Sequence, residues 1–261
     1  MISSITNHYL MLKGAVFLIV RHCFHVGECL GKLLSRLNRG GTLLQVALDF
    51  TKITDAVRVL SALIDLPIDV YEVGTPLIKS EGIKSIEIVR ALVGNDKVVL
   101  ADMKTADTAA LEVELAYGAG ADAMTVLASA DNEVIYAALQ KASELNVDIV
   151  VDTIGVSDIF KRIREMKAMN VKIVNIHIGI DVQKIRQITA ADRLTVIREI
   201  VGTFSDMYIA VSGGIKAADV PGLLQAGVSI IIVGSAITKS GDPRKSAMEI
   251  INILKGVTNN Y

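Results

Sequence analysis

Eight short apolar runs, separated by stretches with helical periodicity, constrain the fold of this 261-residue chain more than any other feature. The runs are rich in Val, Ile and Leu and have the length of buried strands, and after the first of them Ala56, Leu60 and Leu63 recur at helical spacing. Nearly continuous apolar strands joined by helices indicate a parallel sheet with helices on both faces. The predicted strands are 43–48, 68–73, 98–101, 123–127, 147–151, 171–176, 208–211 and 230–233.

Eight strand–helix units without an intervening linker predict one α/β domain, a (β/α)8 TIM barrel, over residues 42–256. An open doubly wound sheet contains the same elements and stays an alternative, because the number of strands does not prove that the sheet closes. Residues 1–41 are interpreted as a short N-terminal extension, helical or disordered, and residues 257–261 as a C-terminal tail.

The composition argues against several kinds of partner. The formal net charge is −1 at pH 7, which gives no electrostatic basis for binding nucleic acid or an anionic membrane. The apolar stretch 10–20 is too short for a membrane span, and no basic segment precedes it as in a signal peptide. Two cysteines in a chain of this length indicate a reducing, cytoplasmic location, and the spacing of His22, Cys23, His25 and Cys29 matches no standard zinc pattern.

Polar residues follow the apolar runs at the carboxyl ends of the predicted strands, where barrels of this fold place their active sites. Four carboxylates, a lysine and a histidine are gathered at five of the strand ends. The boundary between core and water alone does not require so many ionisable groups there, so we expect a site at this end of the barrel. These strand-end residues are Asp49, Glu72, Asp102, Lys104, Ser129, Asp152, His177, Ser212, Gly213, Gly214, Gly234 and Ser235.

The third predicted strand ends in an acid and a base. Asp102 and Lys104 alternate on a strand, so both side chains should point to the same face, and Asp107 follows on the loop. Burying such charges costs several kcal/mol unless they pair with each other or hold a ligand. A ligand site and an Asp–Lys pair that merely closes the barrel rim both fit this pattern.

Two carboxylates and a histidine suggest metal-assisted proton transfer. Glu72 and Asp102 end neighbouring strands, so they could share Mg²⁺, which prefers oxygen ligands completed by water and substrate. With Lys104 beside them, such a cation would stabilise an enediolate next to a sugar carbonyl. His177, the only histidine after the extension, is a candidate general acid–base. The alternatives are rim acids neutralised by Lys104 and a hydrogen-bonded core imidazole.

Glycine-containing loops follow the last two predicted strands, with Ser212, Gly213 and Gly214 in one and Gly234 and Ser235 in the other. Glycine lets backbone N–H groups approach an anion closely, and the loops after strands seven and eight are the usual phosphate site of a (β/α)8 barrel. The sequence therefore predicts that the substrate carries a phosphate group.

Four segments, 44–49, 71–79, 101–107 and 176–181, resemble the 3-hexulose-6-phosphate synthases, a family of the orotidine 5′-phosphate decarboxylase superfamily. The resemblance extends over residues 42–256. It implies a Mg²⁺-dependent aldol reaction that joins formaldehyde to D-ribulose 5-phosphate to give D-arabino-3-hexulose 6-phosphate, or the reverse cleavage. The residues do not indicate which direction operates in the cell.

The resemblance also implies a role for each residue of the matching motifs. Glu72 and Asp102 would bind the metal, Lys104 would stabilise the enediolate, His177 would transfer protons, and Asp49 would orient Lys104 or the substrate hydroxyls. The remaining implied roles are those of Asp107, which would reach across a homodimer interface into the neighbouring site, and of Gly213, Gly214, Gly234 and Ser235, which would hold the phosphate.

Two other activities and one non-enzymatic function remain alternatives. The 3-keto-L-gulonate-6-phosphate decarboxylases keep Glu72 but carry basic residues in the sixth and eighth loops, where 177–181 and 234–236 of this chain contain no arginine. Orotidine 5′-phosphate decarboxylase has a lysine in place of Glu72 and needs no metal. A barrel that binds a sugar phosphate without converting it would not need the acid cluster.

Overall fold

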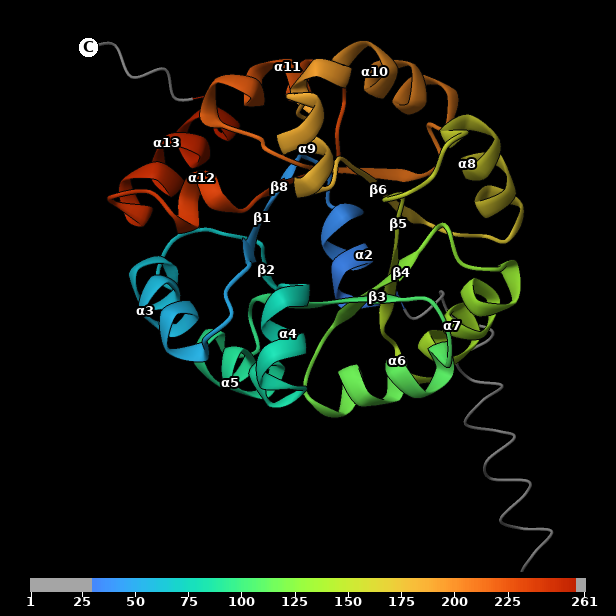
Figure 1. Ribbon diagram of the computed structural model, residues 1–261, viewed down its shortest axis with the longest axis horizontal. Coiled ribbons are helices and arrows are strands. Elements are labelled where there is room, and N and C mark those ends of the chain that lie inside the picture. The colour runs from blue at the N-terminus through green and yellow to red at the C-terminus, as the bar shows by residue number, and fades with distance from the viewer. Residues whose placement is uncertain (1–29, 257–261) are drawn as a thin grey trace, which may run out of the picture. The chain divides into compact units, whose positions relative to one another are not determined.

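A computed structural model describes residues 30–256, and within them eight parallel strands close into a barrel (Figure 1). Each strand pairs with its neighbour in sequence, and β1 also pairs with β8, so the predicted (β/α)8 barrel is confirmed and the open sheet is excluded. The strands are β1 (Leu43–Leu48), β2 (Val70–Val73), β3 (Val98–Thr105), β4 (Ala123–Leu127), β5 (Asp148–Asp152), β6 (Ile173–His177), β7 (Tyr208–Ser212) and β8 (Ile230–Val233).

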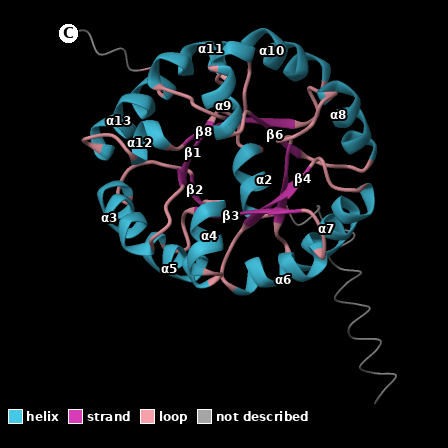
Figure 2. Cartoon of the chain, viewed as in Figure 1, coloured by secondary structure: helices cyan, strands magenta, loops and turns pink. Residues whose placement is uncertain are grey.

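Helices surround the strands (Figure 2). Short helices directly follow β2, β6 and β8, and Figure 1 shows two of them, α4 and α9, inside the ring formed by the longer helices. The helices are α2 (Lys32–Leu37), α3 (Ile53–Leu63), α4 (Thr75–Glu81), α5 (Lys84–Val93), α6 (Ala109–Gly118), α7 (Asn132–Leu145), α8 (Ile159–Ala168), α9 (Ile180–Arg186), α10 (Leu194–Thr203), α11 (Val220–Gln225), α12 (Ser235–Thr238) and α13 (Pro243–Leu254), with 3-10 turns at Ala191–Arg193 and Ala217–Asp219. Over residues 30–256, none of these helices has the length and apolar character needed to span a bilayer.

The apolar side chains form two layers of core, because successive residues of a strand face opposite sides of the sheet. On β1, Leu44, Val46 and Leu48 pack in the outer layer, between the strands and the helices. Leu43 and Ala47 instead pack in the inner layer, which fills the barrel. The outer layer is completed by helix faces with apolar residues about one turn apart, as expected for helices that cover a sheet.

Helix α2 packs into the inner layer at the amino-terminal ends of the strands. Its Leu33 and Leu37 are buried among barrel-interior side chains. Asp148, the first residue of β5, accepts hydrogen bonds from the backbone N–H groups of Leu33 (2.7 Å) and Leu34 (3.1 Å) at the start of the helix. A Cβ at Gly31 would lie 2.3 Å from that carboxylate, so glycine is required there.

The compact unit that contains the barrel therefore begins at Gly31 and includes residues 31–41, which the sequence analysis assigned to the extension. The rest of that extension, residues 1–29, lies outside the described residues, as do the cluster of His22, Cys23, His25 and Cys29 and the tail 257–261.

We expect Asp148→Asn to alter the pH dependence of stability. Burial raises the pKa of Asp148 to about 6, against an ordinary value of 3.8. The folded state therefore binds a proton more tightly than the unfolded state, and the contribution of this group to stability falls as the pH rises between these two values. The stability of the original protein relative to Asp148→Asn should shrink from pH 4 to pH 7, as measured by urea unfolding.

The asparagine variant keeps an oxygen that can accept hydrogen bonds from the start of α2. Comparing it with Asp148→Ala therefore separates the effect of the charge of Asp148 from the effect of capping the helix. The alanine variant leaves two N–H groups of the helix without this acceptor and should lose about 1–2 kcal/mol more than the asparagine variant. A stability difference between the original protein and Asp148→Asn that does not change with pH would contradict the role assigned to burial.

Candidate active site

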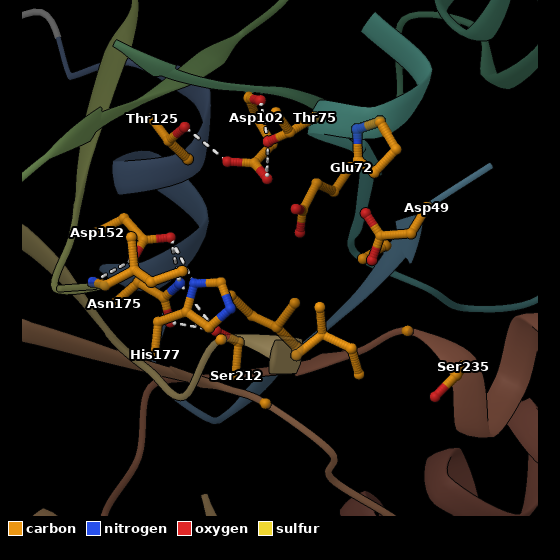
Figure 3. Close-up of a pocket in the computed structure, with 18 of the residues that line it drawn as sticks. Asp49, Glu72, Thr75, Asp102, Thr125, Asp152, Asn175, His177, Ser212 and Ser235 are labelled. Carbon is orange, nitrogen blue, oxygen red and sulfur yellow. Dashed lines mark hydrogen bonds and ion pairs between the residues drawn. The ribbon is translucent and has the colours of Figure 1, made fainter. Parts of the chain in front are cut away.

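A cavity of about 500 Å³ opens at the carboxyl ends of the strands. Ten of the eleven residues that were assigned a site role from the sequence line it, and Asp107 is the exception. Ser129, a strand-end residue without an assigned role, does not line it. Figure 3 shows side chains from different strands converging on this space. The ten residues are Asp49, Glu72, Asp102, Lys104, His177, Ser212, Gly213, Gly214, Gly234 and Ser235.

The buried carboxylate of Asp102 is held by three side chains from neighbouring elements. One oxygen, Oδ2, lies 2.6 Å from Lys104 Nζ. The same oxygen accepts a hydrogen bond from Thr75 Oγ1 at 2.7 Å, and the other accepts one from Thr125 Oγ1 at 2.7 Å (Figure 3). Lys104 Nζ also lies 3.5 Å from Asp152 Oδ2. Burial lowers the pKa of Lys104, but the charges of Asp102 and Asp152 outweigh it and raise that pKa overall. Lys104 is therefore a stable ammonium at neutral pH.

Asp102 and Lys104 meet as predicted, but regular strand alternation is not the reason. The register between β3 and β4 shifts between Ala101 and Thr105, so β3 carries extra residues at this point. Lys104 has a φ of +48°, a left-handed conformation that side chains other than glycine rarely adopt. Its backbone N–H donates to Thr125 Oγ1 at 2.9 Å. A bulge, rather than a flat pleat, thus brings the ammonium onto the carboxylate.

Glu72 is a buried acid with little to balance its charge. Its Oε2 accepts a hydrogen bond from Gln45 Nε2 at 2.6 Å. Burial, followed by the charges of Asp102 and Asp49, raises its pKa well above the ordinary value. Asp49 lies at the more open mouth, where loss of hydration and then the charge of Asp102 raise its pKa too. Figure 3 shows Glu72 and Asp49 on the same side of the cavity.

The oxygen-rich side of the cavity suits a hard divalent cation. The described residues contain no group of three or more His, Cys, Asp or Glu side chains arranged to hold a metal by themselves. Mg²⁺, however, commonly takes one or two carboxylates and completes its shell with water and substrate oxygens. Glu72 and Asp102 fit that role, because two buried acids share this wall and Lys104 is the ammonium beside them.

His177 is oriented by Asp152, to which the sequence analysis assigned no role. His177 Nδ1 lies 2.7 Å from Asp152 Oδ2. Burial would raise the pKa of Asp152, but the hydrogen bond and charge of His177 and the charge of Lys104 lower it. An ionised Asp152 keeps the proton of His177 on Nδ1, which leaves Nε2 as the acceptor. This arrangement suits proton transfer to and from a bound ligand.

Ser212 lines the cavity, but its hydroxyl contacts another side chain. Its Oγ lies 3.0 Å from Asn175 Nδ2 and 3.1 Å from Asn175 Oδ1. Asn175 Nδ2 also lies 3.3 Å from Asp152 Oδ2, so this polar pair supports the acid behind His177.

Both glycines after β7 have backbone and packing requirements of their own. Gly213 and Gly214 have φ values of +116° and +73°. A Cβ on Gly213 would lie 2.5 Å from the carbonyl oxygen of Ile178, and one on Gly214 would lie 2.7 Å from Gln183 Oε1 of α9. The loop after β7 is thus packed against α9, and no larger residue fits there without movement. After β8, Gly234 precedes α12 with an ordinary negative φ.

Asp107 stands apart from the cavity formed by its own chain. It is exposed, and its Oδ1 accepts a hydrogen bond from the N–H of Thr108 at 2.7 Å, just before α6. The structure of the single chain therefore does not bring it to the other predicted residues.

Several side chains that support the site received no role from the sequence. They are Gln45, Thr75, Thr125, Asp152 and Asn175. A common signal was present for three of them. Gln45, Thr125 and Asn175 are single polar residues inside otherwise apolar strands, and in a barrel such a residue can only point into the interior or against the helices. A buried polar side chain needs a partner, so each marks a polar network.

Comparison with known proteins gives a consistent result. The model of the Orotidine 5'-phosphate decarboxylase / HUMPS family matches residues 42–250. The 3-hexulose-6-phosphate synthase of Mycobacterium gastri is 37% identical over 207 residues, which cover 79% of this chain and 97% of that protein.

Two solved structures are also similar. The 3-hexulose-6-phosphate synthase from Salmonella typhimurium superposes with a TM-score of 0.77 at 32% identity, covering 83% of this chain and 100% of that one. The 3-keto-L-gulonate-6-phosphate decarboxylase of Vibrio cholerae superposes with a TM-score of 0.72 at 27% identity, covering 84% and 100%.

We expect Asp152→Ala to change the tautomer of His177. Without the carboxylate, nothing selects Nδ1 as the protonated nitrogen, so the fraction of rings protonated at Nε2 should rise. The imidazole ¹⁵N chemical shifts of His177 measure this fraction directly. Asn175→Ala, which removes a neighbour of Asp152 but not the acid itself, should leave the tautomer unchanged. An unaltered ¹⁵N spectrum in Asp152→Ala would show that Asp152 does not position the ring.

Proposed function

Because this chain belongs to the Orotidine 5'-phosphate decarboxylase / HUMPS family, we propose that it is an aldehyde-lyase of the 3-hexulose-6-phosphate synthase type. It would join formaldehyde to D-ribulose 5-phosphate, or cleave D-arabino-3-hexulose 6-phosphate in reverse. The observation that carries the proposal is the meeting of Lys104, Asp102 and the His177–Asp152 pair in one cavity that also contains Glu72. The low cysteine content supports a cytoplasmic location.

The reaction needs a proton to leave C1 of the ketose, next to the C2 carbonyl. The resulting carbon then bonds to the carbon of formaldehyde, whose oxygen takes up a proton. Lys104 remains an ammonium and so stabilises negative charge on the carbonyl oxygen rather than acting as the base. His177 has its Nδ1 bound to Asp152, so its Nε2 can accept the C1 proton and return it.

We propose Mg²⁺ as the cofactor, held by Glu72 and Asp102. When bound, it would supply positive charge for the oxygens of the ketose. Asp49 is at the mouth on the same side, where it can orient substrate hydroxyls. Formaldehyde offers little surface to bind, so the phosphate of the ketose must supply most of the binding energy. The backbone of Gly213, Gly214, Gly234 and Ser235 lines the part of the cavity that can receive it.

We also propose a homodimer with shared sites, which would give Asp107 a function. Asp107 lies two residues before α6, and that helix carries Leu111 and Leu115, which are 54% and 44% exposed. Tyr136 on α7, which packs beside α6, is 55% exposed. Apolar residues this exposed and this close together favour a protein interface. Such an interface would carry Asp107 towards the cavity of the second subunit.

Formaldehyde release from D-arabino-3-hexulose 6-phosphate tests the activity. Lys104→Ala should lower kcat by roughly 10²–10³-fold, because it removes charge stabilisation of the enediolate. A chelator should abolish turnover and added Mg²⁺ should restore it. Lys161→Ala, which removes an exposed lysine of α8, is the control and should not change kcat. Turnover that survives chelation would refute the metal, and release of carbon dioxide from 3-keto-L-gulonate 6-phosphate would favour the decarboxylase instead.

Subunit complementation tests the shared site. Lys104→Ala and Asp107→Ala proteins should each be nearly inactive, but when they are mixed and allowed to exchange subunits, activity should return. Random assembly makes half of the dimers mixed with one intact site each, so about a quarter of the original activity is expected. No recovery in a mixture shown by mass spectrometry to contain mixed dimers would mean that each subunit works with its own Asp107.

A further inference from the structure

Two lysines at the mouth of the cavity have no role in the site as described so far. Lys184 on α9 and Lys239 directly after α12 both line the cavity. We propose that they form a cationic clamp that pairs with the phosphate dianion of the substrate. This inference rests on the proposed function, because it assigns charged partners to the phosphate end of the ketose.

Lys239 is one helical turn beyond the glycine loop after β8. Its backbone N–H donates to the carbonyl oxygen of Ser235 at 3.0 Å, so it is fixed in register with Gly234 and Ser235. The two residues before it, Ile237 and Thr238, are buried and anchor the turn. The backbone of Lys239 is therefore held in place beside one of the two candidate phosphate loops.

Lys184 stands beside the other loop. The neighbouring residue, Gln183, packs so closely on Gly214 that a Cβ there would lie 2.7 Å from Gln183 Oε1. Gln183 Nε2 in turn donates to the carbonyl oxygen of Ile178 at 2.6 Å, which fixes α9 against the loop after β6. The two lysines thus lie beside the two glycine loops that the sequence assigned to phosphate, Lys184 on α9 next to the loop after β7 and Lys239 next to the loop after β8.

Charge balance in the cavity is the main argument for this assignment. Asp49, Glu72, Asp102 and Asp152 line the cavity, and Lys104 is held by two of these acids. Even with Mg²⁺ held as proposed, the four ionised carboxylates exceed the charges of Lys104 and the cation by one, so the cavity does not attract a phosphate dianion without further cations. Among the residues that the structure describes, neither Lys184 nor Lys239 takes part in an ion pair, so both ammonium groups are available to a ligand.

The clamp also accounts for a departure noted in the sequence. The stretches 177–181 and 234–236 contain no arginine, but a lysine follows each of them within three residues, at positions 184 and 239. The backbone N–H groups of glycine loops can donate oriented hydrogen bonds to a phosphate, but they carry no net charge. Two lysines placed next to those loops would provide the charge, and ion-assisted hydrogen bonds to phosphate are stronger than neutral ones.

The test compares Lys184→Met, Lys239→Met and the double variant, since methionine keeps most of the length of the side chain. Each single change should raise KM for D-ribulose 5-phosphate by about tenfold, and the double change should raise it by about a hundredfold, because each removes a hydrogen bond to a charged group. The kcat at saturating substrate should change far less. Arginine at both positions should restore most of the affinity. Thermal unfolding checks that the variants remain folded.

Lys216→Met is the matched control. Lys216 is an exposed lysine on the loop after β7 but does not line the cavity, so it reports the effect of general charge alone. It should leave KM unchanged. An equal rise of KM in Lys216→Met and in the clamp variants, or a clamp double variant that keeps its KM, would overturn the proposal.

Direct binding separates this inference from the proposed function. Calorimetric titration with inorganic phosphate needs no turnover, so it tests the clamp even if the original protein releases no formaldehyde. Phosphate should bind the original protein and Lys216→Met with the same Kd, and binding should weaken in the double clamp variant. Unaltered phosphate binding in the double variant would refute the clamp, whereas weakened binding in a protein without aldolase activity would refute only the proposed reaction.

Discussion

The carboxylate of Asp102 joins the ends of three neighbouring strands, and the rest of the cavity is arranged around it. Thr75 after β2, Lys104 on β3 and Thr125 on β4 each place a donor atom 2.6–2.7 Å from its oxygens. A buried carboxylate without such partners would cost several kcal/mol. These contacts therefore tie the carboxyl ends of β2, β3 and β4 together and fix the position of the central acid.

The same contacts explain the unusual backbone of Lys104. A left-handed lysine costs of order 1 kcal/mol or more, and a regular strand would avoid that cost. The bulge nevertheless brings Nζ to 2.6 Å from Asp102 and 3.5 Å from Asp152, on β3 and β5. The ammonium thus lies between two acids with different tasks, one beside Glu72 and the other behind His177. The two ion pairs offset the backbone strain at Lys104. The strained conformation in turn places the ammonium of Lys104 inside the cavity.

The barrel was predictable because its signal is repeated, whereas most details of the site depend on single contacts between distant segments. Three strands, 43–48, 123–127 and 230–233, have the predicted bounds. In each of them a polar residue, Thr42, Asp122 or Ser229, directly precedes the apolar run. No local pattern could reveal the bulge in β3, which depends on the pairing with β4. Packing of α2 under the barrel was equally hidden, because its acceptor, Asp148, is more than a hundred residues away. Strand ends identified which residues line the cavity, but not which of them contact one another.

The distribution of charge along the cavity determines how a phosphorylated ketose can enter it. The buried acids Glu72, Asp102 and Asp152 lie deep, on strands. Lys184 on α9 and Lys239 directly after α12 instead lie at the mouth. The deep acids repel a dianion and the lysines attract it, so the proposed clamp would hold the phosphate at the mouth with the carbonyl end of the ketose pointing inward. C1 and C2 of the ketose would then face Lys104 and His177. Formaldehyde contributes almost no binding energy, so it cannot bring the two reacting carbons together by its own binding. The electrostatic field of the cavity can do so by orienting the ketose before formaldehyde arrives.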